Sequence, residues 1–190
     1  MAVRVDRKLP VMPLRVRKIV LFLHVSTSVA WLGLSLGYLA LGITAAVTDR
    51  PEVQHAMFQA LGVFGDVLLL PVSLSAFITG LLLAVGTQWG LLRYKWVIVK
   101  FTLTLLAVLL ILINLLDGID AAVALVDRTP ADQFANMGGG SYRDLISAGA
   151  ASSLMYITCA VLSIFKPWGR TAYGKRKMAG RPGAEPLTKR

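Results

Sequence analysis

A single run of sequence limits what this chain can fold into. From Ile19 to Val47, about 29 residues follow one another without a Lys, Arg, Asp or Glu. A helix rises about 1.5 Å per residue, so a helix of this length crosses a hydrocarbon layer about 30 Å thick with some tilt. We therefore expect a transmembrane helix over residues 19–47 and a fold that is built around it.

Composition extends this conclusion to the whole chain. Hydrophobic residues make up 56% of the 190 residues and charged residues 16%, which is too apolar for an ordinary soluble domain. Three more apolar segments are long enough to cross a membrane, and the four predicted helices are 19–47, 53–86, 95–126 and 142–165. We expect an all-α fold, a polytopic membrane four-helix bundle over residues 19–165. A basic segment, 1–18, precedes it, and a disordered basic tail, 166–190, follows.

The distribution of charge predicts the orientation of the bundle. With both termini on one side, that side holds sixteen Lys and Arg residues, whereas the other side holds three of them and seven acids. Cytoplasmic loops of membrane proteins carry an excess of Lys and Arg. We therefore place both termini in the cytoplasm and expect a multi-pass protein of a bacterial plasma membrane. The net charge of +10 then lies beside anionic lipid headgroups and does not indicate binding to nucleic acid.

The cysteine and histidine content excludes several kinds of site. Cys159 is the only cysteine, which excludes a disulfide within the chain and a cysteine-based zinc or iron-sulfur site. The histidines are His24, near the cytoplasmic end of the first helix, and His55, at the outer end of the second. Because they lie toward opposite sides of the membrane, these two residues cannot bind one haem iron together.

The first helix has one polar face. Four polar or amphipathic residues follow one another at steps of four, three and four, which places them on one stripe: His24, Ser28, Trp31 and Ser35. We expect this stripe to face protein rather than lipid. Gly33 and Gly37 form a pair of small residues that lets another helix approach closely, either within the bundle or in a homodimer.

Counting along the helices predicts two levels of polar residues inside the membrane. Three residues on three helices fall roughly 8 to 11 Å below the cytoplasmic basic residues: His24, Lys100 and Cys159. A second level, nearer the outside, holds Asp66, Asn114 and Ser152 or Ser153. Asp66 lies within an apolar span, and we expect it to be buried. Because a buried carboxylate in lipid needs a partner or a proton, Asn114 is a candidate partner.

Each of these residues also has an ordinary structural interpretation. Lys100 lies close enough to the inner surface for its ammonium group to reach the headgroups. His24 can donate a hydrogen bond to a serine or to a backbone carbonyl of a neighbouring helix. Cys159 can be a small packing residue, and an acid near the outer interface can serve the structure alone. The choice depends on how each helix is rotated.

Two short motifs resemble those of a known family. His24 with Trp31-Leu32-Gly33, and Trp96 with Lys100 at the start of the third helix, are similar to the paired signatures of the four-helix membrane protoporphyrinogen oxidase and the related copper-resistance D membrane domain. The resemblance implies haem binding by His24, Trp31 and Lys100, with His24 as the metal ligand, and an activity that needs Lys100. Over its whole length, the chain resembles a bacterial family of uncharacterised four-helix integral membrane proteins.

Three functions follow from these observations. The first is a membrane oxidoreductase or redox-associated protein with one haem b near the inner leaflet, held by His24. Lys100 then orients a carboxylate of the haem or of a hydrophobic small-molecule substrate. The second is a non-catalytic scaffold or subunit of a membrane complex, whose basic cytoplasmic face binds anionic lipid or a partner. The third is a proton-linked carrier that uses Asp66 and Lys100, although the chain has no inverted repeat.

Overall fold

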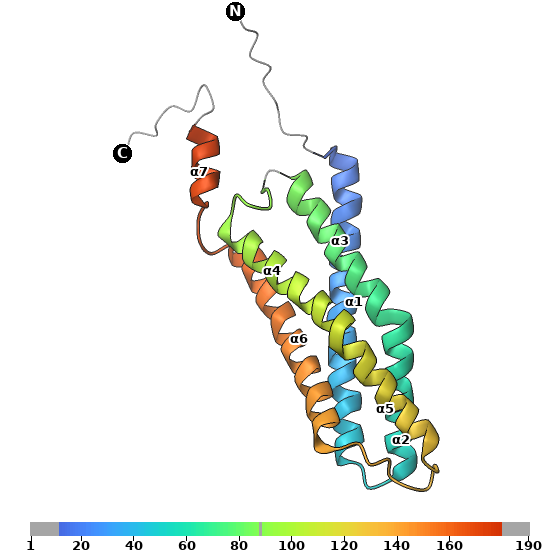
Figure 1. Cartoon of the computed structure of the whole chain (residues 1–190). Coiled ribbons are helices and arrows are strands. Elements are labelled where there is room, and N and C mark those ends of the chain that lie inside the picture. Colours follow the sequence, from blue (N-terminus) through green and yellow to red (C-terminus); the bar gives the residue numbers. More distant parts are fainter. Residues whose placement is uncertain (1–11, 88, 180–190) are drawn as a thin grey trace, which may run out of the picture.

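The computed structural model describes residues 12–87 and 89–179, and the regular structure within these ranges is helical. Helices α1 to α6 and two π-helical turns, η1 and η2, build four segments that are long and apolar enough to cross a membrane (Figure 1). Their bounds are α1 Leu14–Val47; α2 Pro51–Val63, η1 Phe64–Leu69 and α3 Leu70–Gly86; α4 Lys95–Leu110, η2 Ile111–Leu115 and α5 Leu116–Arg128; and α6 Gly139–Phe165. A short helix, α7 Ala172–Ala179, follows. The chain is an all-α, four-helix membrane protein.

Prolines set several of the helix boundaries. α1 begins at Leu14, directly after Pro13 and five residues earlier than predicted. α2 has Pro51 as its first residue, a position where the missing N–H group is not needed. α6 ends at Phe165, because Lys166 adopts a left-handed conformation and a proline follows it. The four predicted spans are confirmed to within a few residues at each end.

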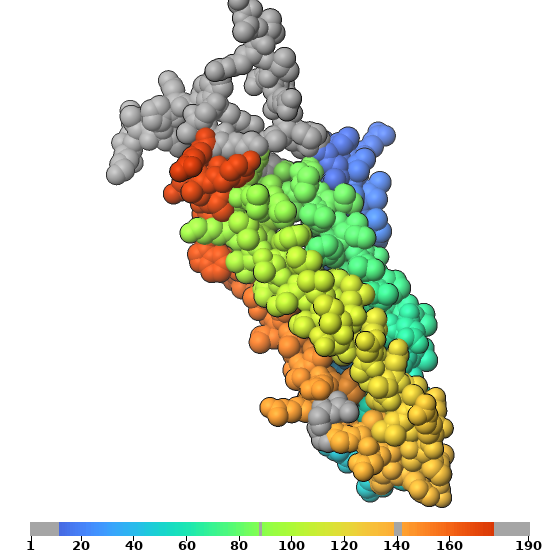
Figure 2. Space-filling view, in the orientation of Figure 1, coloured from blue at the N-terminus to red at the C-terminus, as the bar shows by residue number. Residues whose placement is uncertain are grey.

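The two ends of this long, narrow bundle differ in charge (Figures 1 and 2). The chain enters α1 and leaves α6 at one end, beside the short connection between α3 and α4. At this basic end, the described stretches 12–18, 89–95 and 166–179 contain Lys and Arg but no Asp or Glu. The opposite, acidic end carries Asp49, Glu52, Asp127, Asp132 and Asp144. The charge asymmetry expected from the sequence thus corresponds to two physical ends of the molecule.

Two of the spanning segments contain a π-helical turn. η1 lies just before Pro71, which has no N–H group and whose ring crowds the carbonyl four residues earlier. The wider turn is a known way of accommodating such a break in a helix. η2 contains no proline, and its local sequence offers no comparable reason for the wider turn. Each turn interrupts the regular spacing of side chains along its segment.

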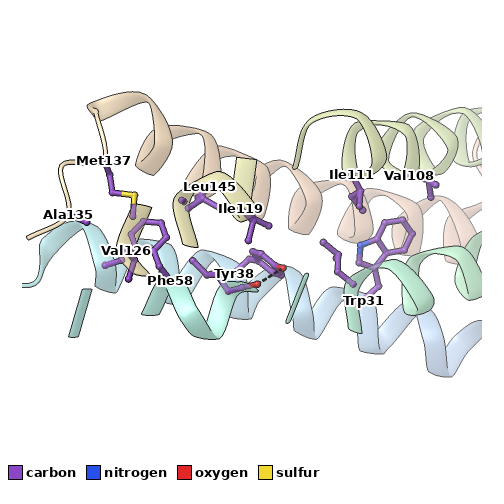
Figure 3. Close-up of a cluster of buried hydrophobic side chains, with 14 of the residues drawn as sticks. Trp31, Tyr38, Phe58, Val108, Ile111, Ile119, Val126, Ala135, Met137 and Leu145 are labelled. Atoms are coloured by element: carbon purple, nitrogen blue, oxygen red, sulfur yellow. Dashed lines mark hydrogen bonds between the residues drawn. The ribbon is translucent and has the colours of Figure 1, made fainter. Parts of the chain in front are cut away.

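The core follows α1 along its length. Trp31, Tyr38 and Ala45 are buried and are spaced seven residues apart, so they lie on one face of α1. This helix packs against α2, α3 and α6. Its buried residues share one hydrophobic cluster with residues of the other segments (Figure 3): Phe58, Leu61, Leu69, Ala76, Val108, Ile111, Ile119, Ala122, Val126, Ala135, Met137 and Leu145.

A glycine allows α6 to approach α1 closely. A Cβ atom on Gly149 would lie 3.0 Å from the backbone nitrogen of Leu39 and 3.1 Å from its Cα atom. Of the two glycines that were predicted to allow a close approach to α1, Gly33 and Gly37, only Gly37 has a neighbour in the bundle. A Cβ atom on Gly37 would make ordinary contact with Phe64, at 3.5 Å, and a Cβ atom on Gly33 would meet nothing within 4 Å. Gly33 therefore makes no close helix contact within the bundle, and its use in a homodimer stays a prediction.

Buried polar side chains of α2 hold the loop at the acidic end. The Gln54 amide donates to the carbonyl of Ala135, at 3.3 Å, and to the Tyr142 hydroxyl, while it accepts from the Ala135 N–H at 2.8 Å. His55 Nε2 donates to the carbonyl of Gln133, at 3.0 Å. His55 thus has a structural role at the end of the bundle opposite the start of α1.

The first part of the tail departs from the expectation of disorder. Residues 166–179 are described, and α7 docks on the connection between α3 and α4. The Thr171 N–H donates to the carbonyl of Arg93, at 2.9 Å, and the ammonium of Lys166 lies 4.7 Å from the centre of the Trp89 ring. These contacts supply partners that composition alone does not reveal. Residues 1–11 and 180–190 lie outside the described ranges.

We predict that Gly149→Val destabilises the fold by about 1 to 3 kcal/mol, because the new side chain collides with the backbone of α1 and cannot move aside. Gly33→Val is the matched control, since its side chain enters open space, and it should change the stability by no more than about 0.5 kcal/mol. Reversible unfolding in mixed micelles measures both. Equal effects of the two variants would contradict the observed packing of α1 against α6.

Candidate functional site

His24 is attached to α3 by hydrogen bonds. Its Nδ1 atom lies 3.1 Å from the carbonyl oxygen of Ala76 and 3.2 Å from the hydroxyl oxygen of Thr79. Because a carbonyl only accepts, Nδ1 carries the proton and Nε2 has the lone pair. The imidazole is half-buried against Gly80, where a Cβ atom would lie 2.9 Å from Cε1 of the ring. The small residue at this position makes room for the histidine.

Lys100 is held inside the bundle. Its ammonium group donates to the hydroxyl of Ser163 on α6, at 2.5 Å, and lies 5.9 Å from the centre of the Trp96 ring. Ser163 in turn donates to the carbonyl of Cys159, at 2.8 Å. Among the described residues, no Asp or Glu pairs with this ammonium group. The side chain therefore joins α4 to α6, and its charge has hydroxyl and aromatic partners but no anion.

The structure brings Lys100 together with His24 and Cys159. The ammonium interacts electrostatically with both residues, and the Thr104 hydroxyl is within reach of the Cys159 thiol. Three helices, α1, α4 and α6, thus contribute to one group of side chains near the basic end. We refer to His24, Lys100, Cys159 and Ser163 as the inner cluster.

The second level expected from the sequence does not form as a group. Asp66 and Asn114 are exposed on the surface of the bundle, and no hydrogen bond joins them to each other among the residues that the structure describes. The expectation that both are buried polar residues is therefore wrong. Asp66 lies in η1 and Asn114 in η2, so the wider turns displace both from the stripes drawn at regular helical spacing. Ser152 is half-buried and makes a hydrogen bond of 2.6 Å with Ser35.

Trp31 lies deeper in the bundle than the inner cluster. It follows His24 by seven residues, about 10 Å along the helix axis. Its ring is fully buried and contacts the ring of Tyr156 edge to face, with 4.9 Å between the centres. The indole nitrogen of Trp31 and the hydroxyl of Tyr156 are both buried without a hydrogen-bond partner. Trp31 thus lies about two helical turns from His24 on the same face of α1, and its part in haem binding stays a prediction.

Several partners in the inner cluster are not evident from the sequence. Ser163 could have been found, because it follows Cys159 by one helical turn. Thr79 and Gly80 gave no such signal, since their importance depends on how α3 is rotated toward His24. Among the described residues, no group of three or more His, Cys, Asp or Glu side chains could hold a metal ion. The cluster thus offers one imidazole lone pair and one cation.

A family model now gives this chain a place among known sequences. The model of the family described as predicted integral membrane protein (DUF2269) matches residues 18–167. The chain belongs to this family. No curated protein and no solved structure matches the chain. The match does not extend to the protoporphyrinogen oxidase or copper-resistance D families, so any haem-related role of His24 and Lys100 has to be argued from the geometry of this protein.

We predict that Ser163→Ala lowers the free energy of unfolding by about 1 to 3 kcal/mol, because the half-buried ammonium group of Lys100 loses its hydroxyl acceptor. Ser147→Ala removes an exposed hydroxyl of the same helix and is the matched control. A double-mutant cycle with Lys100→Met should show a coupling energy of about 0.5 kcal/mol or more. Additive effects would mean that the ammonium group of Lys100 lies at the membrane surface instead.

Proposed function

We propose that this multi-pass membrane protein is redox-associated and binds one haem b at the inner cluster. The observation that carries the proposal is the hydrogen bond from His24 Nδ1 to the carbonyl of Ala76, which leaves the lone pair on Nε2. Histidines that ligate metals usually donate their other ring N–H to a carbonyl, a carboxylate or water. His24 is thus held in the tautomer and orientation that an axial ligand needs.

Lys100 supports the same proposal. A half-buried ammonium group without an acidic partner attracts an anion, and a haem carries two propionate carboxylates. Because Lys100 interacts electrostatically with His24, a propionate bound by its ammonium group would lie near the imidazole. On the α3 side the imidazole has no free space, since Gly80 lies against its Cε1 edge. A haem would therefore have to approach Nε2 from the side of the ring that faces away from Gly80.

The proposed role assigns separate tasks to the protein and the haem. When bound, the haem supplies one-electron chemistry. His24 holds it, and Lys100 orients an acidic group of the haem or of a hydrophobic substrate, so the protein would be an oxidoreductase or a redox subunit. We further propose a bacterial plasma membrane with the basic end in the cytoplasm, because cytoplasmic segments are enriched in Lys and Arg.

We predict that the protein purified from haem-replete membranes has a Soret band and that His24→Ala lowers its haem content by about tenfold or more. His55→Ala is the matched control, because it removes the other histidine, which bonds to a loop carbonyl at the acidic end. Absorption spectra of the oxidised and dithionite-reduced protein measure this content. A colourless, folded wild-type protein, or a band that is unchanged in His24→Ala, would contradict the proposal.

The charge of the basic end favours a second candidate function. The described parts of this end carry only basic charge, and α7 presents Lys175 and Arg176 on an exposed surface. Each base near a membrane surface attracts anionic lipid by about 1 kcal/mol. The aromatic residues Trp89, Tyr94 and Trp96 pack together at the same level, as is typical of a membrane interface. The alternative is a non-catalytic subunit or scaffold whose basic face binds anionic lipid or an acidic partner.

We predict that a Lys175→Gln/Arg176→Gln variant retains about threefold less phosphatidylglycerol than wild type in mixed-lipid nanodiscs. An Arg50→Gln/Arg128→Gln variant removes the same charge from exposed positions at the acidic end and should retain as much as wild type. Lipid analysis by mass spectrometry compares them. If both variants lost phosphatidylglycerol equally, the net charge of the protein and not its basic end would account for lipid binding.

A further inference from the structure

α4 and α6 lie close together near the basic end and separate toward the acidic end (Figure 1). The Lys100 to Ser163 hydrogen bond joins them on the basic side of the gap. Between the separated parts lies a cavity of about 780 Å³, lined by residues of α1, α4, η2, α5 and α6. This volume is within the range of about 300 to 1,000 Å³ that is typical of small-molecule sites. Figure 2 shows this side of the molecule, with α4 and α5 in front and α6 beside them.

The cavity is open toward the surrounding lipid. Leu106 and Leu110 of α4 and Ala151 of α6 line it and are also exposed on the surface of the bundle. Gly118 of α5 lines it too, and a Cβ atom at this position would meet nothing within 4 Å. The apolar walls suit a hydrophobic molecule that enters sideways from the bilayer.

The floor of the cavity contains a hydrogen-bond donor without an acceptor. Trp31 lines the cavity and is only 1% exposed, and no group of the described residues accepts a hydrogen bond from its indole nitrogen. In Figure 3 the nitrogen is on the edge of the ring that is turned toward Tyr38 and Ile119, which line the same cavity. An unpaired buried N–H group costs free energy, and such groups are rare in folded proteins. A bound oxygen atom would remove this cost.

A hydroxyl pair lies on the same floor. Ser35 donates to the carbonyl of Trp31, at 3.0 Å, and its oxygen is 2.6 Å from the hydroxyl oxygen of Ser152. Because the Ser35 proton is already used, Ser152 is the donor within the pair. Both hydroxyl protons are then occupied. The amide of Asn114 also lines the cavity but is exposed, so among the described residues of the lining Trp31 is the fully buried donor without an acceptor.

The depth of Trp31 limits which ligand fits. This residue follows Lys18 by 13 residues and precedes Val47, the last residue of α1, by 16, so it lies about 20 and 24 Å from them along the helix. The indole nitrogen is therefore near the middle of the hydrocarbon layer. The headgroups and the ester carbonyls of phospholipids lie at the interface, outside this layer. The acceptor must be carried into the membrane interior by an apolar molecule.

We propose that this cavity binds a lipophilic carbonyl compound, a ketone or quinone with an apolar body, and that Trp31 donates a hydrogen bond to its carbonyl oxygen. The apolar body lies against the leucine side chains of α4. Gly118 leaves the space that the body occupies next to α5. The site is distinct from the inner cluster, because none of the four residues of that cluster lines the cavity. It does not depend on haem binding.

Binding of a decyl-substituted benzoquinone to the full-length protein in detergent, measured by titration calorimetry, tests the proposal. Trp31→Phe keeps the aromatic ring but removes the N–H group, and we expect about fivefold weaker binding. Gly118→Leu fills the cavity without a collision inside the protein, and we expect at least tenfold weaker binding. Trp168→Phe, at an exposed position, and Gly33→Leu, at an open glycine outside the cavity, are the matched controls and should bind as wild type.

The same titration with decylbenzene, which has no carbonyl oxygen, separates the hydrogen bond from apolar contact. The proposal predicts that wild type binds decylbenzene more weakly than the benzoquinone. It also predicts that wild type and Trp31→Phe bind decylbenzene equally. Equal affinity of wild type and Trp31→Phe for the quinone would overturn it and leave an apolar cavity filled by lipid chains. Absence of saturable quinone binding, or binding that Gly118→Leu leaves unchanged, would also overturn it. Thermal unfolding shows whether each variant is folded.

Discussion

The bundle depends on hydrogen bonds that α1 makes with three different helices. His24 bonds to a carbonyl of α3, Ser35 to a hydroxyl of α6, and Tyr38 to a carbonyl of α2. Lipid offers no water to replace a bond that is lost when helices move apart, so each bond fixes the rotation and depth of one neighbour. α4 is attached differently, through Lys100 to α6. Apolar packing adds to this bond, since the ring centres of Phe101 on α4 and Phe77 on α3 lie 5.5 Å apart.

The lengths of the spanning helices and the depths of individual residues in the membrane could be predicted from the sequence, because both follow from counting residues. The uncharged runs gave the four spans, and the charges at their ends gave the two ends of the bundle. Depth follows from the rise of about 1.5 Å per residue when the connections are short. His24, Lys100 and Cys159 were placed at one level on this ground, and in the structure Lys100 interacts electrostatically with each of the other two.

The rotation of each helix about its own axis could not be predicted, because it depends on packing between helices and on local breaks in helical geometry. Asp66 and Asn114 were expected to be buried on the assumption of regular spacing, but each lies in a π-helical turn and is exposed, Asn114 at the lining of the cavity. Gly33 illustrates the same limit, since its spacing from Gly37 suggests a packing face, yet no neighbour lies near it. The partners of His24 and Lys100 also depend on rotation, which is why the sequence left several interpretations of both residues open.

The inner cluster and the cavity between α4 and α6 each lack one interaction partner, and the missing partner differs between them. In the inner cluster, the imidazole and the ammonium group have hydroxyl and carbonyl partners, and the missing group is an anion. In the cavity, the missing group is an acceptor for the Trp31 N–H. Trp31 is fully buried against the ring of Tyr156, and no described residue accepts a hydrogen bond from its indole nitrogen. The acceptor must come to Trp31, and the separation of α4 from α6 leaves an opening from the lipid through which a hydrophobic molecule can carry one.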